Sequence, residues 1–389
     1  SSAGGDQTVV TAVRSNGTTT AVATLVGTPS SAVQFDPVGN AYQVTYATSG
    51  GVTRTTVTRI GLDQSSTIVL TVDGMPSGSM QFDPDGVLYQ FGHNPTTGTT
   101  VLGTYRPSDG LTRMSIPVDG TPRPLFLSST GDDLYVLSAA DGTAAFKTGT
   151  ANTTTLVVLR PDGSTDVAPS ASVPEYSYSN SYDVVIRSDG VVYTLITGDG
   201  QTALSVIRAD GTALTSAPVE GNGSLYRVIS GPGGDFAFTT YRSTAGPDGP
   251  TWTSRLTVVG ADGSTITSDA IDGSDGQPVM GADGTAAMAL GTNAVVIHPN
   301  GGQTTTGPVA GFSYSRMTVN DNGTVYQLLS GSTGTNYYLS AVIVIRPDGT
   351  TSDPIMIDGT PGVVLFLSYT DGETRARTLR FAGPNAQSC

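Results

Sequence analysis

Short phrases built on Asp-Gly or Asn-Gly recur along the chain and are the first candidates for chemistry. Examples are RPDGST (160–165), GADGST (260–265), HPNGGQ (298–303) and RPDGTT (346–351). The side-chain oxygens of Asp and Asn can bind calcium. A calcium loop needs further oxygen ligands, however, and DPDGVLYQF (83–91) supplies no later carboxylate. The same residues form tight turns, because glycine accepts positive φ and Asp or Asn caps the turn. The phrases therefore predict turns and no metal site.

The residue patterns of familiar catalytic sites are missing from the sequence. It contains no HExxH, GxSxG, P-loop or dinucleotide-binding pattern. Of the two histidines, His298 falls in one of the turns, so a Ser-His-Asp triad would have to rest on His93 without any supporting signal. A carboxylate pair, as in glycosidases, stays open as an alternative, because 32 acidic residues offer many pairs. We predict no catalytic residue and no cofactor.

The turns divide the chain into short strands that repeat in groups of four. Turns of one kind centre on Asn16-Gly17, Asp63-Gln64, Asp109-Gly110, Asp162-Gly163, Asp210-Gly211, Asp262-Gly263, Asn300-Gly301 and Asp348-Gly349. Turns of a second kind centre on Gly39, Gly86, Gly131, Gly190, Gly234, Gly284, Gly323 and Gly372. Each turn is flanked by short β-branched or aromatic runs, so a repeat holds four strands, A to D, with the second kind of turn between A and B and the first between C and D. Four-stranded antiparallel units at this period predict an all-β fold, a β-propeller with one unit per blade.

The two ends of the sequence complete each other. Residues 8–25 contain a C–D hairpin without an A–B partner before it, and residues 363–381 contain an A–B hairpin without a C–D partner after it. We predict an eight-bladed propeller in a single domain, 1–389, whose closing blade is shared between about 7–27 and 363–382, which would remove sheet edges. Seven blades remain the alternative, with 278–310 as the weakest repeat.

The blade phrases resemble those of known propeller families. VQFDPVGNAYQVTY (33–46) and MQFDPDGVLYQF (80–91) are similar to NHL and YncE-type repeats with a D-x-x-G-x-x-Y core, and VIRPDGTT (344–351) resembles propeller domains of secreted mycobacterial and related actinobacterial proteins. The resemblance covers essentially the whole chain. It implies the fold and leaves function open, because such families include enzymes, lectins and scaffolds.

Acidic residues occupy one relative position in successive D–A connections. They are Asp73, Asp119, Glu220, Asp272 and Asp358. In a propeller the D–A and B–C connections lie on the face opposite the turns, where a ring of carboxylates can hold a cation or a basic partner. The alternative is that Asp-Gly and Glu-Gly are again turn formers at strand ends.

Aromatic and arginine residues of the same face form the predicted ligand site. The residues of this predicted site are Tyr176, Tyr178, Tyr226, Arg227, Trp252, Tyr314, Arg316 and His93. Tyrosines beside polar groups suit a carbohydrate or a protein partner. Alternatively, the tyrosines fill gaps between blades and Trp252 begins a C strand. Long B–C loops are expected at 241–252 and at 139–155, the latter carrying the only lysine, Lys147.

Composition restricts the partners. A net charge of −14 disfavours nucleic acid, and no apolar run approaches the ~20 residues of a membrane span. The only cysteine, Cys389, excludes an internal disulfide. One lysine and abundant Thr, Ser and Gly favour a secreted or cell-surface protein.

Three functions are compatible with this sequence. The first is a non-catalytic extracellular propeller that binds a protein or a cell-envelope component through the D–A and B–C connections. The second is a glycan-binding lectin, and the third is a carbohydrate-active hydrolase or lyase.

Overall fold

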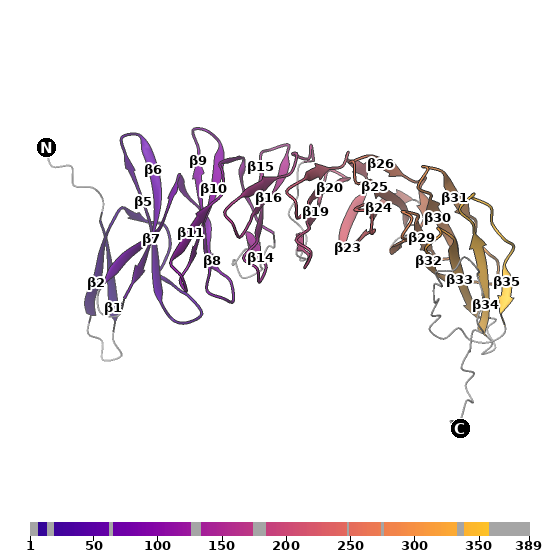
Figure 1. Ribbon diagram of the computed structural model, residues 1–389, viewed down its shortest axis with the longest axis horizontal. Helices are drawn as coiled ribbons and strands as arrows, with labels where there is room; N and C mark the ends of the chain where they lie inside the picture. The colour runs from indigo at the N-terminus through magenta and orange to yellow at the C-terminus, as the bar shows by residue number, and fades with distance from the viewer. Residues whose placement is uncertain are drawn as a thin grey trace, which may run out of the picture. The chain divides into compact units, whose positions relative to one another are not determined.

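The protein is built from β-strands alone in the part of the chain that the structure describes. The structure is a computed structural model that describes residues 7–13, 19–61, 65–125, 134–173, 184–246, 249–273, 276–332 and 338–357. Figure 1 shows these residues as a succession of antiparallel sheets without a helix. Two compact units are distinguished, Ser1–Asp199 with Ser205–Thr215, and Gly200–Leu204 with Ser216–Cys389. No described segment forms a helix that could cross a membrane.

The first strands form a hairpin and three larger sheets. The hairpin pairs β1 (Gln7–Val13) with β2 (Thr19–Val26). The first sheet contains β3 (Thr28–Pro29), β4 (Gln34–Phe35), β5 (Ala41–Ser49), β6 (Val52–Ile60) and β7 (Ser66–Asp73). The second contains β8 (Met75–Phe82), β9 (Leu88–Asn94), β10 (Thr99–Arg106), β11 (Leu111–Met114) and β12 (Val118–Asp119). The third contains β13 (Thr121–Arg123), β14 (Val136–Ser138), β15 (Ala144–Gly149), β16 (Thr154–Leu159) and β17 (Thr165–Val167).

Four further sheets follow along the chain. The fourth contains β18 (Val185–Ile186), β19 (Val192–Gly198), β20 (Gln201–Ile207), β21 (Ala213–Thr215) and β22 (Val219–Glu220). The fifth contains β23 (Asn222–Ser230), β24 (Phe236–Gly246), β25 (Gly249–Val259), β26 (Thr265–Thr267) and β27 (Ile271–Asp272). The sixth contains β28 (Pro278–Met280), β29 (Ala286–Leu290), β30 (Asn293–Ile297) and β31 (Gln303–Thr306). The seventh contains β32 (Tyr314–Val319), β33 (Val325–Ser332), β34 (Tyr338–Ile345) and β35 (Ile355–Ile357).

Each larger sheet has the strand order of a propeller blade. The strands run A, B, C, D as an antiparallel meander, and five strands are counted where an edge strand is divided, as when β11 and β12 both pair with β10. The central strands are buried on both faces, as in β16 with all six residues buried, because neighbouring sheets cover them. These features confirm the all-β, blade-type prediction. The eight-blade count and the single domain remain predictions, and residues 363–382, predicted to complete the closing blade, lie outside the described part.

Apolar layers between consecutive sheets form the core. In one layer Tyr42 and Val57 of the first sheet pack with Leu88 and Tyr105 of the second. The next layer brings Phe91 against Phe146 of the third sheet, with ring centroids 5.3 Å apart. In the second unit the fifth, sixth and seventh sheets are joined in the same way. The stability of the fold therefore depends on contacts between neighbouring repeats.

The Asp-Gly and Asn-Gly phrases within the described residues are turns, as predicted, whereas Asn16-Gly17, Asp63-Gln64 and Gly372 lie outside them. In the first A–B turn the Asp36 carboxylate accepts hydrogen bonds from the backbone N–H groups of Val38 and Asn40, and Gly39 has a φ of 90°. In a C–D turn Asp162 accepts from the N–H of Ser164 at 2.9 Å. The tyrosine of the D-x-x-G-x-x-Y phrase donates its hydroxyl proton back to the aspartate, as Tyr42 does to Asp36 at 3.2 Å.

The third sheet corrects one prediction. Its A–B turn is not at Gly131, which lies outside the described residues, but at 139–143, where the N–H of Ala139 donates to the carbonyl of Thr143 and Gly142 has a φ of 90°. Residues 139–155 are therefore no long B–C loop, and Lys147 lies fully buried within β15. Asp141-Gly142 has the same turn chemistry as the phrase chosen from the sequence, so local pattern alone could not decide between them.

Candidate functional site

A projecting hairpin of the fifth sheet forms the centre of the site. Its strands β24 and β25 have 11 residues each, and their ladder continues to the pair Gly246 and Gly249. Neighbouring strands accompany only the inner part, since β23 reaches as far as Tyr241 and β27 as far as Thr253. The remaining residues, 242–246 and 249–252, form a two-stranded segment that we call the arm. The B–C loop expected at 241–252 is thus a continuation of the strands.

Two aromatic rings pack together at the base of the arm. Trp252 lies opposite Ser243 in the ladder, and its ring centroid is 5.8 Å from that of Tyr241, at an interplanar angle of 46°. Trp252 remains 41% exposed although it belongs to a paired strand. The C strand begins at Gly249, three residues before Trp252, and the assignment of Trp252 to a ligand face remains a prediction.

A bulge in β23 brings an arginine to these rings. Gly223 pairs with Thr240 and the next pair is Val228 with Phe238. Between these pairs the chain advances five positions along β23 but only two along β24. Arg227 lies in this bulge, with its guanidinium carbon 5.8 Å from the centroid of the Tyr241 ring. An arginine over a tyrosine face is attracted by the ring quadrupole, which holds both side chains in place. Bulges commonly direct side chains toward binding sites.

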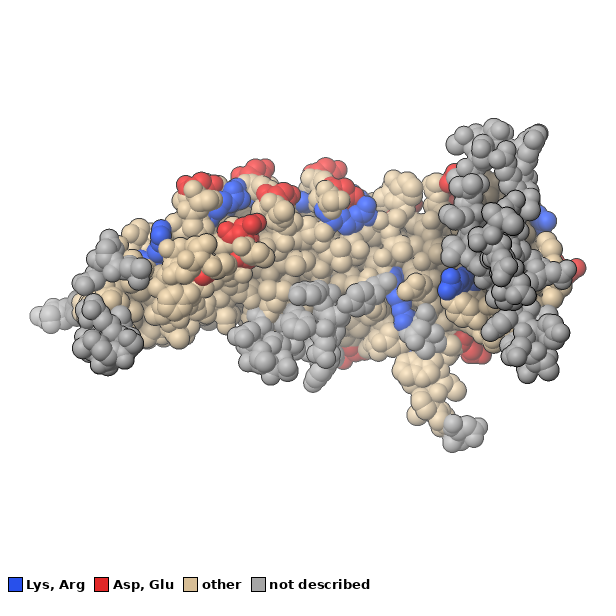
Figure 2. All heavy atoms as spheres, turned by 90° about the horizontal axis from the view of Figure 1, so that it is seen from below, with Lys and Arg blue, Asp and Glu red and all other residues tan. Residues whose placement is uncertain are grey.

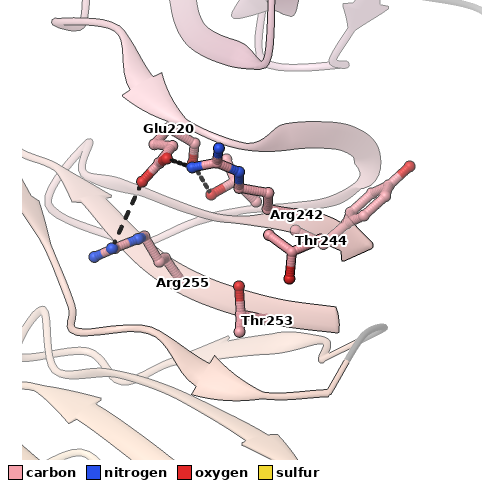
Figure 3. A pocket seen from close by; sticks show the side chains of 7 residues that line it. Glu220, Arg242, Thr244, Thr253 and Arg255 are labelled. Atoms are coloured by element: carbon pink, nitrogen blue, oxygen red, sulfur yellow. Dashed lines mark hydrogen bonds and ion pairs between the residues drawn. The ribbon is translucent and has the colours of Figure 1, made fainter. Parts of the chain in front are cut away.

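On the opposite side of β24 from the rings, a carboxylate lies between two further arginines. Figure 3 shows Glu220 of β22 with Arg242 of β24 on one side and Arg255 of β25 on the other. Glu220 forms an ion pair with Arg242, and its Oε2 lies 3.7 Å from Nη2 of Arg255. The second guanidinium also donates to the carbonyl of Ser268 at 3.0 Å. A hollow of about 170 Å³ lies beside these charged groups, and its lining also includes Thr240, Tyr241, Thr244 and Thr253.

The linker glycine after Glu220 explains how the carboxylate reaches this place. Gly221 has a φ of 105°, and its carbonyl accepts a hydrogen bond from the Thr202 hydroxyl at 2.8 Å. The Thr240 hydroxyl donates to the carbonyl of Glu220, also at 2.8 Å. A Cβ on Gly221 would lie 3.0 Å from the Tyr241 carbonyl oxygen, so glycine allows the linker to cross β24 closely.

The same lock recurs at the linkers of other sheets. A Thr or Ser hydroxyl of a C strand donates to the glycine carbonyl in the pairs Thr8–Gly27, Thr55–Gly74, Thr100–Gly120 and Ser254–Gly273. The acids before these glycines, where present, therefore belong to repeated linkers, in agreement with the turn-former alternative. The described residues contain no group of three side chains that could hold a metal ion, and Asp358 lies outside them.

The structure brings some of the predicted site residues together and separates others. Arg227 and Trp252 share the cluster around Tyr241. Tyr314 and Arg316 form a second pair at the start of β32, where the Arg316 Nε donates to the Tyr314 hydroxyl at 3.3 Å. Tyr226 lies in the β23 bulge, but its side chain is outside the description. Tyr176 and Tyr178 lie outside the described residues.

Both histidines are hydrogen-bonded to threonine. His93 lies near the C-terminal end of β9, in the first unit, and its Nδ1 is 3.1 Å from the hydroxyl oxygen of Thr100. His298 lies buried in a C–D turn, as the sequence predicted, with Nε2 3.0 Å from the hydroxyl oxygen of Thr304. Neither contact has the geometry of a catalytic base oriented by a carboxylate.

Sequence reasoning missed Tyr241, Arg242 and Arg255 as site residues. The segment YRSTAGPDGPTW (241–252) resembles a loop because it contains four Gly and Pro residues, and Arg255 lies beyond it. A signal was present, because Pro-Asp-Gly is a turn phrase and the residues on its two sides have the pattern of paired strands, as expected for a long hairpin. The position of Glu220 was recognised, but its arginine partners depend on the strand register.

Comparisons with known proteins add only remote similarities. No protein-family model and no curated protein matches the chain. Among solved structures, it is similar to a streptogramin B lyase (14% identity over 72% of this chain and 82% of that chain, TM-score 0.28). It is also similar to the hydrazine synthase of Kuenenia stuttgartiensis (14%, 82% and 95%, TM-score 0.27) and to TolB from Acinetobacter baumannii (12%, 81% and 82%, TM-score 0.24).

Proposed function

We propose that this chain is a non-catalytic extracellular binding protein that contacts a protein or cell-envelope component through the arm of the fifth sheet. The observation that supports this proposal best is the cluster of Trp252, Tyr241 and Arg227. Tryptophan, tyrosine and arginine are the residue types that dominate binding interfaces. Their mutual packing restricts the rotamers before any ligand arrives, so binding requires less ordering of side chains.

The form of the arm also favours binding. Beyond Tyr241 and Thr253 both strands of the arm lie outside the ladders of β23 and β27. The arm residues other than Gly246 are exposed, and Thr244 and Thr251 bond to each other across the arm through hydroxyls 2.7 Å apart. A two-stranded segment gains little stability by itself. Its length therefore has no evident role in the core, and recognition of a ligand gives it one.

A substitution at Trp252 tests the proposal. A glycan array and affinity capture from a bacterial cell-envelope extract first supply a ligand, and the affinities of Trp252→Ala and Tyr314→Ala for that ligand are then measured by calorimetry. We expect Trp252→Ala to weaken binding by about thirtyfold, the usual cost of truncating an aromatic anchor. Tyr314→Ala shows whether the pair of Tyr314 and Arg316 contributes to binding.

Phe35→Ala is the matched control, because Phe35 is also an exposed aromatic residue on a strand but lies in the first unit. It should leave the affinity unchanged. Equal binding by the wild type and by Trp252→Ala, with the variant folded, would place the contact surface elsewhere.

A further inference from the structure

The two arginines beside Glu220 depart from the repeat. Arg242 follows Tyr241, which lies opposite Ser254, the residue whose hydroxyl bonds to the linker glycine of this sheet. By the strand register, the residues at the same position of the first three sheets are Ala47, Asn94 and Thr150. Arg255 aligns in the same way with Thr56, Val101 and Thr155. Acidic linker residues occur in several repeats. Among these four sheets, only the fifth has arginines at both aligned positions beside an acidic linker residue. In a repeat protein, residues that the repeat does not require are candidates for function.

Stability alone does not account for the arginine pair. The side chains of Glu220, Arg242 and Arg255 are 48%, 57% and 34% exposed. Ion pairs this accessible to water are screened and contribute little to folding. The linker is held instead by the hydroxyl groups of Thr202 and Thr240, which bond to backbone carbonyls at 2.8 Å.

The hydrogen-bonding capacity of the arginines exceeds what the protein uses. Each guanidinium has five N–H donors in a planar fork that fits a carboxylate. The contacts of Arg242 and Arg255 within the described residues are those with Glu220 and the carbonyl of Ser268. Both side chains line the open hollow, so the remaining donors are accessible to a ligand.

The local charge is opposite to that of the whole chain. The protein carries a net charge of −14, and on the face in Figure 2 acidic and basic side chains lie next to one another without a large patch of one sign. The described lining of the hollow contains two guanidinium groups, those of Arg242 and Arg255, and one carboxylate, that of Glu220. An anionic group is therefore favoured here and disfavoured over most of the surface.

We infer that Arg242 and Arg255 bind the carboxylate of an acidic oligosaccharide, an inference that rests on the proposed binding function of the arm. Glu220 occupies the place of the ligand carboxylate in the free protein and keeps the two guanidinium groups oriented. A neighbouring sugar ring packs on Trp252 and Tyr241, and the threonine hydroxyls around the hollow bind sugar hydroxyls. Side chains alternate along β24, so Tyr241 and Arg242 lie on opposite sides of it, and the ligand must span more than one sugar unit.

Two matched ligands test the inference. Short oligogalacturonates and their fully methyl-esterified forms have the same rings but differ in charge, and hyaluronan oligosaccharides supply a second uronate. Calorimetry should show the acid forms binding about tenfold more tightly than the esters, with a preference that decreases as salt is added. Arg242→Gln combined with Arg255→Gln should remove this preference. Glu220→Gln should strengthen binding of the acid form alone, because the competing carboxylate is gone. Thermal melting checks that each variant is folded.

Equal affinities for acid and ester, failure of all these uronates to bind, or a preference that survives the double arginine substitution would overturn the inference. Binding of poly-glutamate in place of uronates would do the same and would identify an acidic peptide as the ligand. Trp252→Ala separates the two proposals. If that variant loses the ligand captured from the envelope extract while no uronate binds, the arm is the binding surface and the carboxylate site is wrong. If Trp252→Ala has no effect on any ligand, the proposed function fails first.

Discussion

Asp36 shows how one side chain holds a blade turn together. Its Oδ1 accepts from two backbone N–H groups, and its Oδ2 accepts from the Asn40 amide at 2.7 Å and from the Tyr42 hydroxyl. Burial raises the pKa of Asp36, but these hydrogen bonds to the charged form outweigh burial and leave the pKa below its ordinary value of 3.8. The aspartate of the repeat phrase is therefore a turn cap bound in its ionised form.

This pKa shift predicts a loss of stability in acid. Because the folded-state pKa lies below the unfolded value, Asp36 stabilises the fold fully above about pH 5, and the contribution is lost as the pH falls through the folded pKa. Asp36→Asn removes an acceptor from Tyr42 and Asn40 and should cost about 1–2 kcal/mol near neutral pH, and less at about pH 2. Urea unfolding of both proteins at several pH values measures this. A cost that does not change with pH would contradict the assignment.

Arg160 shows that two copies of one phrase can have different roles. In RPDGST its Nε pairs with Asp166 at 2.7 Å, while its terminal nitrogens donate to the carbonyls of Gly190 and Arg208 at 2.9 and 2.6 Å. It thereby joins the C–D turn of the third sheet to two turns of the fourth. The corresponding Arg346 of RPDGTT donates to Thr350 at 3.3 Å in an exposed position.

Alanine substitutions should separate these roles. Arg160→Ala leaves the half-buried Asp166 and two carbonyls without this partner and should lower the free energy of unfolding by about 3 kcal/mol. Arg346→Ala, the control in the same phrase, should change it by less than about 0.5 kcal/mol. Chemical denaturation compares the two. Similar effects would mean that the inter-sheet contacts of Arg160 contribute nothing beyond the turn.

At the scale of elements, the linkers between sheets need glycine for two reasons. Gly74 has a φ of 108°, and a Cβ there would lie 2.6 Å from the carbonyl carbon of His93 on β9. Gly39 in an A–B turn has a φ of 90° but has open space around the position of a Cβ. The linker therefore requires both a left-handed conformation and a close approach between strands, whereas the turn requires only the first.

This difference predicts unequal costs for the same substitution. Gly39→Ala should destabilise the protein by about 1 kcal/mol, the usual cost of placing alanine at positive φ. Gly74→Ala adds a steric conflict with the backbone of β9 and should cost about 3 kcal/mol or more. Thermal and urea unfolding measure both variants. If Gly74→Ala is no worse than Gly39→Ala, the linker can move away from β9 easily, and the close crossing is not a requirement of the fold.

At the scale of the molecule, the N-terminal hairpin has the features of a C–D pair. The Thr8 hydroxyl donates to the carbonyl of Gly27 at 2.7 Å, which is the lock that other sheets form between a C strand and the linker after D. Within the described residues this hairpin is a two-stranded sheet, and Val9 and Val26 are exposed on it. That an A–B hairpin from about 363–382, outside the described residues, completes this blade remains a prediction.

Truncation tests the shared blade. Removal of residues 1–25 should lower the melting temperature and the solubility together, because an unpaired strand edge would be exposed. Removal of 363–389 should have a similar effect, and the double truncation should cost less than the sum, because each single truncation already loses the same pairing. Unchanged melting in either single truncation would contradict a shared closing blade.

Much of the fold could be predicted from the sequence because its signals are local. The turn at Asp36 and the turn at Asp162 are specified by four or five consecutive residues, and the runs between them have the period of strands. The third repeat shows the limit of this reasoning, since Gly131 and Gly142 both lie in turn-forming phrases and the pattern selected the wrong one. The choice depends on which strand Phe146 and Lys147 join, and this is decided by packing against neighbouring sheets.

The sequence predicts turns and short strands grouped in fours, Asp-Gly phrases that cap those turns, and acids before the linkers. The meeting of Glu220 with Arg242 and Arg255 of the next sheet, and the packing of Trp252 on Tyr241 near Arg227, become visible only in three dimensions. The physical reason is that turn chemistry acts over a few neighbouring residues. Side-chain contacts across strands depend on register, on the bulge of β23 and on where the linker crosses β24, and no short segment of sequence contains that information.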